Sequence, residues 1–296
     1  MAPTLRSRTR IDSLPNEVLE KVFVNLDDAS KCKASCVCSK WRDVIYARRK
    51  NDVVCIRNIE KVRQCVSFFV RNRVQKYKLR YQTLSELHKT VSVMNLNTRV
   101  KIVHLDLSGS TCVIDTAFKK SFARLTSLKW LSLDGCTGID LHGLRYVLEK
   151  MVKLEHLSLK HGNVTFGVLI YMPRMNLQYL DLSYCQFLDN YSVQYPVCCF
   201  LNLKTLILDG VQDVSDEVIE MAFIYLSCLE TLSVRNCKLV KGIVKTPCPV
   251  GFKLLDIRGC DGRHEIDTTI FDAINSRRDG SVLVRFTTPI DSDVSI

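Results

Sequence analysis

The sequence predicts an α/β solenoid of parallel strands and helices that follows a small all-α unit near the N-terminus. Three observations lead to this prediction. Aliphatic residues recur at fixed offsets with a step of 23 or 26 residues, a cysteine often follows them at a fixed distance, and positions 11–45 carry two helical apolar stripes. With 296 residues and 47% apolar content, the chain can bury a large core.

The repeat is defined by aliphatic residues at offsets 0, 3 and 5, counted from the first residue of each copy. The copies begin at positions 102, 128, 154, 177, 203, 229 and 252. The residues at the three offsets are Ile102/Leu105/Leu107, Leu128/Leu131/Leu133, Leu154/Leu157/Leu159, Leu177/Leu180/Leu182, Leu203/Leu206/Leu208, Leu229/Leu232/Val234 and Phe252/Leu255/Ile257. This pattern is typical of a leucine-rich-repeat horseshoe, with parallel strands on the concave side and helices on the convex side.

Cysteine usage indicates a reduced protein with structural thiols. Four of the fourteen cysteines stand at offset 8 of a copy: Cys136, Cys185, Cys237 and Cys260. A thiol at that place is predicted to act as a small buried apolar group and as a weak donor to the turning backbone. The other cysteines do not form two Cys-x-x-Cys halves at zinc spacing. We therefore expect no metal site and no cofactor.

The segments that connect the strands are predicted to form helices on the convex side. Apolar residues show helical spacing in two of them, at Leu141/Leu144/Leu148/Met151 and at Val218/Met221/Ala222/Tyr225. The two 23-residue steps are shorter by about one helical turn, and they contain Pro173 and Pro247. Near the C-terminus, positions 282–284 with Phe286 are expected to form a closing strand.

The N-terminal region begins with a basic stretch and continues with a helical pattern. Positions 1–10 contain three arginines and no acidic residue, so we expect a disordered arm. Pro15 suits the first turn of a helix, and Glu17 lies where the helix dipole favours an acid. The first apolar stripe consists of Leu19, Val22, Phe23 and Leu26, with Val18 beside it. After Asp27-Asp28, the second stripe consists of Ala34, Val37, Cys38, Trp41 and Ile45.

These two stripes resemble the F-box, a short helical motif. The residues that carry the resemblance are Leu14-Pro15, Glu17, Leu19, Phe23, Leu26-Asp27 and Val37-Cys38-x-x-Trp41-Arg42. The sequence departs from the pattern at Asp28, where the family often has proline, at Lys31, where leucine is common, and at Cys36, where a larger aliphatic residue is usual. A plain helical cap that seals the first repeat is the alternative interpretation.

An F-box followed by repeats resembles the F-box and leucine-rich-repeat protein family, the substrate receptors of Skp–cullin–F-box ubiquitin ligases. The resemblance implies that the F-box binds a Skp-type adaptor, and through it a cullin, while the repeats bind a target protein for ubiquitin conjugation and proteasomal degradation. The adaptor-binding residues that it implies are Leu14, Pro15, Val18, Leu19, Val22, Phe23, Leu26, Val37, Cys38 and Trp41.

These features divide the chain into a basic arm at 1–10, an F-box at 11–48, a linker with irregular first repeats at 49–100, the repeat array at 101–290 and a frayed tail at 291–296. Within 49–100, positions 53–56 have the pattern of a strand, and positions 62–70 have that of a helix. Val74, Tyr77 and Leu79 match the repeat offsets one step before Ile102, so an irregular repeat is expected there.

The sequence carries no motif of a common catalytic site, so we expect a binding protein and not an enzyme. It has no G-x-S-x-G, Walker A, H-E-x-x-H or G-x-G-x-x-G pattern, and its six histidines are scattered. No apolar run approaches the length of a membrane span. The first residues are basic but precede no apolar signal-peptide region. These features lead us to expect a protein of the cytoplasm or nucleus without membrane contact.

The concave face of the repeats is the predicted target-binding surface. Because side chains alternate along a strand, residues at offsets 2, 4 and 6 should share this face. The candidate target-binding residues are His104, Trp130, His156, Tyr179, Asp181, Arg235 and Arg258. Trp, Tyr and Arg are the side chains that dominate binding hot spots. The alternative is that these rows are solvated and that Trp130 packs on its neighbours.

Two other functions are compatible with the sequence. One is a nucleic-acid-binding module, because positions 40–80 contain 13 basic residues against 3 acidic ones. This function is disfavoured, because the basic region has few of the interleaved aromatic residues on which single-stranded bases stack. The other is a scaffold that binds the adaptor through the F-box and recruits no cullin.

Overall fold

The structure is a computed structural model of the whole chain. The residues that it describes are 14–26, 28–35, 37–46, 54–56, 75–79, 89, 101–110, 119, 122, 124–136, 141–170, 172, 176–260, 270, 272, 274, 282–285 and 294–295. The basic arm expected at 1–10 and the helix expected at 62–70 lie outside this set.

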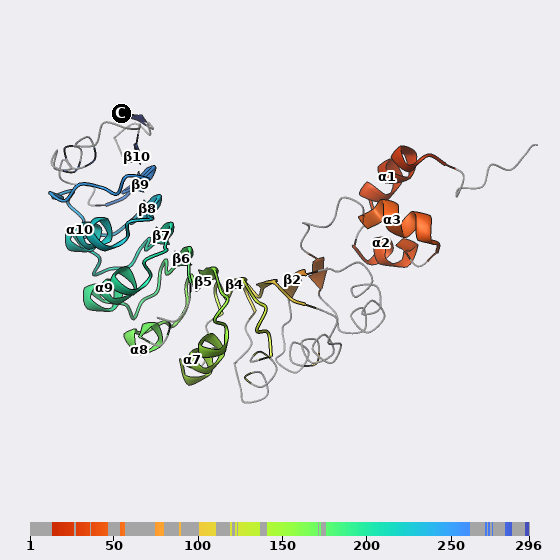
Figure 1. Cartoon of the computed structure of the whole chain (residues 1–296), viewed down its shortest axis with the longest axis horizontal. Coiled ribbons are helices and arrows are strands. Elements are labelled where there is room, and N and C mark those ends of the chain that lie inside the picture. The colour runs from red at the N-terminus through yellow and green to blue at the C-terminus, as the bar shows by residue number, and fades with distance from the viewer. Residues whose placement is uncertain are drawn as a thin grey trace, which may run out of the picture.

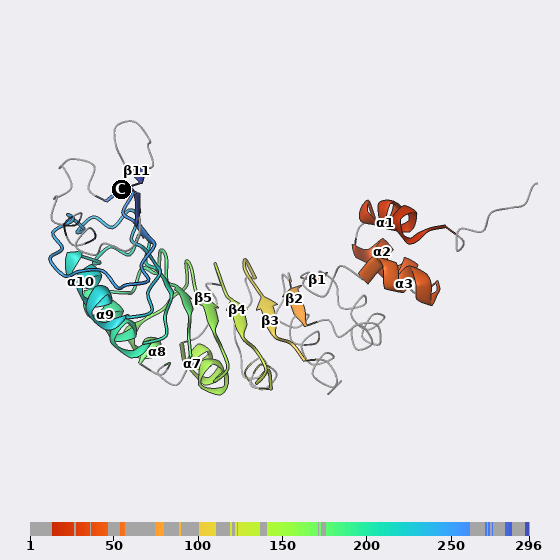
Figure 2. The ribbon, with the colours of Figure 1, turned by 45° about the horizontal axis from the view of Figure 1, so that its top comes forward.

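The predicted solenoid is confirmed: in the described part of the chain, eleven strands form one sheet in sequence order. The strands are β1 (Val54–Ile56), β2 (Lys76–Leu79), β3 (His104–Asp106), β4 (Trp130–Ser132), β5 (His156–Ser158), β6 (Tyr179–Asp181), β7 (Thr205–Ile207), β8 (Thr231–Ser233), β9 (Leu254–Asp256), β10 (Leu283–Arg285) and β11 (Val294–Ser295). Offset 3 stays in register, so that Leu131 pairs with Leu157 and Leu157 with Leu180. Figure 2 shows the strands side by side along a curved array.

The repeat leucines build one continuous core beneath the sheet. In all seven copies, the residues at offsets 0, 3 and 5 are at most 5% exposed. They form a single cluster with apolar residues of the convex segments, such as Leu148, Val197 and Val218. Burying a leucine side chain contributes roughly 1.5–3 kcal/mol. Each copy therefore gains most of its stability by contact with the copies on either side of it.

The four thiols at offset 8 act as the sequence predicted. The Sγ atoms of Cys136, Cys185 and Cys237 each donate to a backbone carbonyl oxygen at 3.3 Å, and the acceptor belongs to offset 5 of the preceding copy. Cys260 makes the same contact at 2.9 Å, and the hydroxyl of Ser110 replaces the thiol in the first copy. A buried donor thus links each of these copies to the copy before it.

The chain turns away from the sheet through a left-handed residue at offset 7 of every copy. Four copies have glycine there, which adopts a positive φ without steric cost: Gly109, Gly135, Gly210 and Gly259. The other three copies place His161, Tyr184 and Asn236 in the same conformation, with φ of 56° to 58°. A non-glycine residue there is uncommon because its Cβ is crowded by the backbone. The turn geometry therefore follows from the repeat and not from the local residue.

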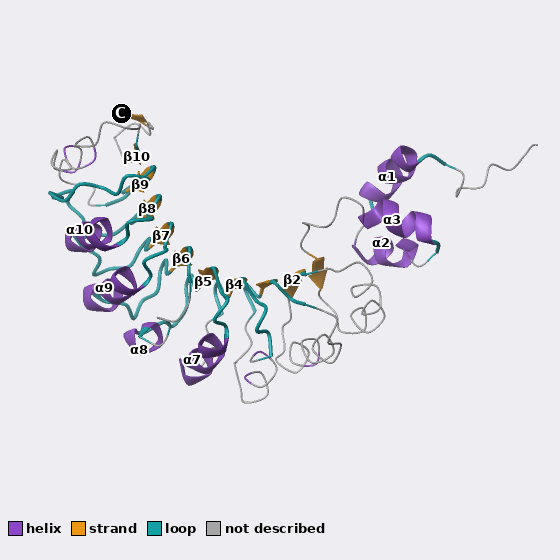
Figure 3. Ribbon diagram, viewed as in Figure 1, coloured by secondary structure: helices purple, strands orange, loops and turns teal. Residues whose placement is uncertain are grey.

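Helices cover the convex side of most copies, as predicted (Figure 3). They are α7 (Leu141–Lys150), α8 (Phe166–Leu169), α9 (Asn190–Cys199) and α10 (Asp216–Tyr225). The first shortened step accommodates only the four residues of α8, which agrees with its missing turn. In the described part of the chain, no helix is long and apolar enough to cross a membrane.

The second shortened step contains no helix, unlike the other convex segments that the structure describes in full. Residues 234–253 are fully described and run from β8 to β9 without a helix. The carboxylate of Asp216 on α10 accepts the backbone N–H groups of Lys241 and Gly242 at 2.9–3.2 Å. Glu220, one turn later, accepts the N–H of Lys245 at 2.8 Å. These acids satisfy backbone donors that a helix would have satisfied within itself.

The N-terminal helical unit consists of α1 (Asn16–Val24), α2 (Asp28–Ser35) and α3 (Ser39–Tyr46), as Figure 1 shows. The sequence predicted two helical stripes; the structure divides the second between α2 and α3. Leu19, Phe23, Val44 and Ile45 form a core of their own. Because this core is a different cluster from that of the repeats, the unit and the solenoid are two packing units.

Strands at both ends extend the array beyond the seven regular copies. β1 and β2 pair parallel with their successors, with Tyr77 opposite Leu105, so two strands continue the sheet before position 101. β10 is the closing strand expected at 282–284. Positions 291–296 were expected to form a frayed tail, but Val294 and Ser295 form β11 and pair antiparallel with β10. This pairing covers backbone groups that would otherwise lie at an open sheet edge.

Candidate protein-binding surfaces

The ten predicted adaptor-binding residues fall into two groups. Leu19 and Phe23 are 0% and 4% exposed and form the core of the N-terminal helical unit. Three more of the ten residues, Leu14, Leu26 and Trp41, are partly buried and pack against that core. The Trp41 ring lies 5.0 Å from the Phe23 ring, and the Trp41 backbone N–H donates to the Sγ of half-buried Cys38 at 3.4 Å. In this structure these six residues hold the three helices together.

The remaining four residues are exposed. Val18, Val22 and Val37 are 41%, 46% and 61% exposed, and Pro15 is also exposed. Val18 and Val22 lie on one face of α1, and Pro15, at its N-cap, precedes them at the same helical spacing. Val24, 68% exposed on another face, was missed because it lies outside the apolar stripe. Several exposed valines on so small a unit are typical of a protein-binding surface.

On the concave face, four predicted residues form an aromatic ladder. His104 stacks on Trp130 with ring centroids 3.7 Å apart, Trp130 on His156 at 4.7 Å, and His156 on Tyr179 at 3.8 Å. The ladder follows offset 2 across β3 to β6, where each ring meets the ring of the next strand. Trp130 is therefore half-buried between two imidazoles, so the alternative interpretation, in which it packs on its neighbours, describes it correctly.

Burial and nearby charges set the protonation of the two histidines in the ladder. Burial lowers the pKa of His104 to about 4, and nearby Lys76 adds to this effect. Burial also lowers the pKa of His156 to about 4, with a smaller contribution from His104. Both imidazoles are therefore neutral near neutral pH. A neutral ladder offers ring edges to the concave surface, because the ring faces contact one another.

The ladder predicts a loss of stability in acid. Because the folded pKa of about 4 lies below the ordinary value of 6.5, these groups stabilise the fold above pH 6.5. That contribution is lost as the pH falls from 6.5 towards 4. Since both side chains are half exposed, we expect a combined loss of about 1–2 kcal/mol after solvent screening. Urea unfolding as a function of pH measures it.

A double variant tests the origin of this acid effect. In His104→Phe with His156→Phe, the rings still stack but no longer titrate, so the slope of stability between pH 6.5 and 4 should become smaller. The control is His142→Phe on α7, an exposed histidine away from the ladder, which should keep the original slope. An unchanged slope in the double variant would show that other groups cause the acid loss.

Residues at offsets 4 and 6 share the concave side, as alternation predicts, but many of them are buried. Asp181, a candidate target-binding residue, is 8% exposed and accepts hydrogen bonds from the backbone N–H and hydroxyl of Ser183. Burial raises the pKa of Asp181, against the effect of these hydrogen bonds. Its carboxylate is therefore occupied within the protein and is little accessible to a partner.

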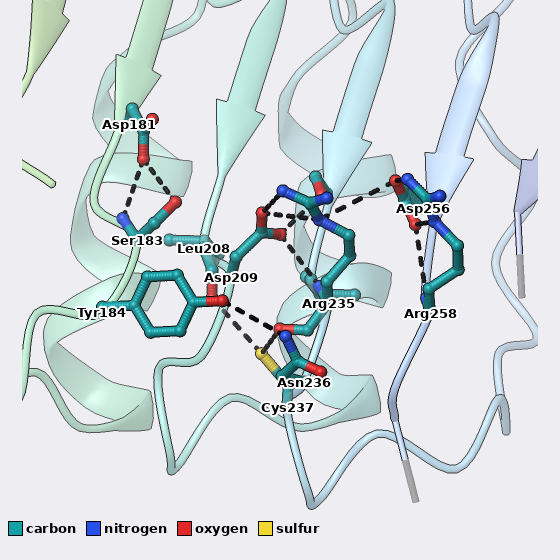
Figure 4. Close-up of polar contacts among 12 residues, drawn as sticks. Asp181, Ser183, Tyr184, Leu208, Asp209, Arg235, Asn236, Cys237, Asp256 and Arg258 are labelled. Carbon is teal, nitrogen blue, oxygen red and sulfur yellow. Dashed lines mark hydrogen bonds and ion pairs between the residues drawn. The ribbon is translucent and has the colours of Figure 1, made fainter. Parts of the chain in front are cut away.

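The other two candidates, Arg235 and Arg258, belong to a row of alternating charges across β7 to β9 (Figure 4). The Nε and Nη2 of Arg235 donate to Asp209 at 2.8 and 2.6 Å. Arg258 donates to both carboxylate oxygens of Asp256 at 2.9 and 2.7 Å. Arg235 also lies 3.9 Å from Asp256, which joins the two pairs. The arginines are the exposed members of this row.

Two residues that the sequence did not single out complete this part of the surface. The amide of Asn236 donates to the hydroxyl of Tyr184 at 3.2 Å (Figure 4). The Tyr184 ring stacks on His161 at 4.9 Å and lies under the ammonium of Lys160. His161, Tyr184 and Asn236 each stand at offset 7 of their copy and have a left-handed backbone, a conformation often found at functional sites. In the sequence, only the glycines at the same offset of other copies indicate that this position has a left-handed backbone.

Comparison with known proteins agrees with both parts of this description. Residues 11–49 match the F-box-like family, and residues 176–196 match the leucine rich repeat family. No curated protein matches the chain. Among solved structures, an internalin C2 from Listeria monocytogenes is similar, with 19% identity, a TM-score of 0.43 and coverage of 76% of this chain and 89% of its own. A Rad7–Elc1 complex structure from yeast gives 13% identity, a TM-score of 0.42 and coverage of 82% of each chain.

Proposed function

We propose that this chain, whose residues 11–49 match the F-box-like family and residues 176–196 the leucine rich repeat family, is the substrate-recognition subunit of a Skp–cullin–F-box type ubiquitin ligase. The F-box, the N-terminal helical unit of the structure, binds a Skp-type adaptor and through it a cullin. The concave face of the repeats binds a target protein. In this role the protein works in the cytoplasm or nucleus, needs no cofactor and leads its target to proteasomal degradation.

The observation that carries the proposal is that the chain has two separate cores, each with apolar or charged side chains left exposed on its surface. The F-box has its own core around Leu19 and Phe23, yet leaves Val18, Val22 and Val37 more than 40% exposed. A unit of this size buries little surface and is only marginally stable, so covering these valines with a partner is favourable. The repeats keep a second surface for a different partner.

The chain's contribution to ubiquitin transfer is proximity and not bond-making, so we propose that it is not itself an enzyme. A target held on the concave face shares one assembly with a ubiquitin-conjugating enzyme that the cullin carries. The encounter between that enzyme and the target's lysines becomes intramolecular, which raises their effective concentration.

Replacing Val18 and Val22 with serine should weaken adaptor binding. Each valine contributes apolar area that the adaptor would cover, so the double variant should lose about 2 kcal/mol, or roughly thirtyfold in affinity. Titration of purified adaptor by calorimetry measures this loss. The control is Val152→Ser with Val250→Ser, which removes two valines of the solenoid that are 51% and 76% exposed. Equal affinity of wild type and the F-box variant would contradict the assignment.

Co-purification with a cullin tests the second half of the proposal. Tagged wild-type protein should retain both adaptor and cullin, and the Val18/Val22 variant should lose both together, because the adaptor lies between them. Adaptor without cullin would contradict the ligase role and favour a scaffold.

A further inference from the structure

The paired charges on the concave face expose their positive members and bury their negative ones. The side chains of Arg235 and Arg258, the arginine patch, are 41% and 39% exposed. Those of Asp209 and Asp256 are 2% and 7% exposed. Asp209 also accepts the Ser233 hydroxyl at 2.5 Å and the Arg235 backbone N–H at 2.9 Å. A molecule that approaches these strands therefore meets guanidinium nitrogens before carboxylate oxygens.

The buried carboxylates also hold the arginine patch in place. Each guanidinium donates through Nε and Nη2 to an aspartate that is itself fixed beneath the surface. An arginine has five N–H donors, so the Nη1 group of Arg235 extends the donor surface beyond these bonds. Because the side chains are already ordered, binding a partner costs less side-chain entropy than it would for free arginines.

The surroundings of the arginine patch offer further donors and little exposed negative charge. Exposed Asn236 follows Arg235 in the chain, and half-buried Tyr184 lies beside Asn236 (Figure 4). The neighbouring offset-2 residues Thr205 and Thr231 are half-buried and neutral. Over the described residues 205–209, 231–236 and 254–258, the acids are Asp209 and Asp256, both buried. The patch therefore complements a partner that presents carboxylates.

From this complementarity we infer that the arginine patch binds an acidic segment of the target protein. The planar fork of a guanidinium matches a carboxylate with two parallel hydrogen bonds. A nucleic acid fits the same face less well, because the inner ring faces of the aromatic ladder lie against one another, with centroids 3.7–4.7 Å apart, and are not open to stacking on bases. The inference rests on the proposed function only in taking the target to be a protein.

Fluorescence anisotropy with defined probes tests the inference on the full chain. The probes are a fluorescein-labelled oligoglutamate peptide, an oligolysine peptide of the same length and an oligouridine of matched charge. Oligoglutamate should bind wild type at low ionic strength and weaken with added salt. Arg235→Gln with Arg258→Gln should bind it at least about tenfold more weakly, because charge-assisted hydrogen bonds are lost.

Two further variants control for charge and for folding. Arg145→Gln with Lys150→Gln removes two positive charges from α7 on the convex side and should keep wild-type affinity. If loss of Arg235 unfolds the array by leaving Asp209 unpaired, Asp209→Asn with Arg235→Gln removes both charges and keeps the shape. This folded variant should also bind oligoglutamate more weakly than wild type. Thermal melts identify the folded variants.

Three results would overturn the inference. The first is that oligoglutamate does not bind wild type. The second is that the concave and convex variants weaken oligoglutamate binding equally. The third is that oligouridine binds wild type at least as tightly as oligoglutamate and loses the same affinity in the concave variant. None of these measurements involves the adaptor or cullin. A chain that binds oligoglutamate through the arginine patch but fails to bind the adaptor would keep this inference and lose the proposed ligase role.

Discussion

Phe23→Ala should unfold the F-box while the solenoid melts as in wild type. Phe23 is 4% exposed and packs with Leu19, Val44 and Ile45. Truncating a buried phenylalanine costs about 3–5 kcal/mol, which is comparable to the whole stability of a unit this small. Hydrogen exchange followed by mass spectrometry should show lost protection in peptides of α1 and α3, and adaptor binding should disappear with it.

A conservative variant separates this structural role from direct contact with the adaptor. Phe23→Leu keeps most of the buried volume, so protection of α1 and α3 and adaptor binding should both persist. If Phe23→Ala instead kept full protection and lost only adaptor binding, the side chain would act at the interface and not in the core. The melting of the repeats, followed by circular dichroism, is the internal reference because the two cores are separate clusters.

Gly210→Ala should destabilise the array by about 3 kcal/mol. Its φ of +65° is unfavourable for alanine, which costs about 1–2 kcal/mol. A Cβ would also overlap the ring of Tyr184, which adds about 1–3 kcal/mol of overpacking. The matched control is Gly135→Ala, because its φ is +67° and its Cβ would meet no described atom within 4 Å. That variant should lose only the backbone contribution.

A double-mutant cycle isolates the steric part. In a Tyr184→Gly background the overlap is absent, so Gly210→Ala should cost about as much as Gly135→Ala, or ~1 kcal/mol. Urea unfolding of the four proteins supplies the comparison. Equal costs of Gly210→Ala with and without the tyrosine ring would show that Tyr184 moves aside freely.

The regular part of the fold could be predicted because the same pattern of aliphatic residues occurs in seven copies. Residues such as Leu131 and Leu157 occupy equivalent offsets, so their burial and pairing follow from the period alone. The turn at offset 7 was equally regular, but its left-handed backbone was visible in the sequence only where glycine occurs. Tyr184 and Asn236 adopt it because neighbouring copies impose the geometry, and no local signal marks them.

The binding surfaces were less predictable because they depend on how elements pack. Val18 and Leu19 are adjacent apolar residues of α1, and only the position of α3 decides that Leu19 is buried while Val18 is exposed. Alternation placed Trp130 and Arg235 on the concave face correctly. It did not show that the ring of Trp130 lies between two imidazoles, or that Asp209 lies beneath Arg235.

The offset-8 thiols give the array its own chemical reporters of local opening. Burial raises the pKa of Cys185 and Cys237 to about 12 and that of Cys260 to about 11, so almost no thiolate forms in the folded copies. A thiol-alkylating reagent can therefore reach each sulfur only after its own copy has separated from the preceding one. Because these cysteines are distributed from Cys136 to Cys260, the order in which they are alkylated would reveal from which end the horseshoe frays.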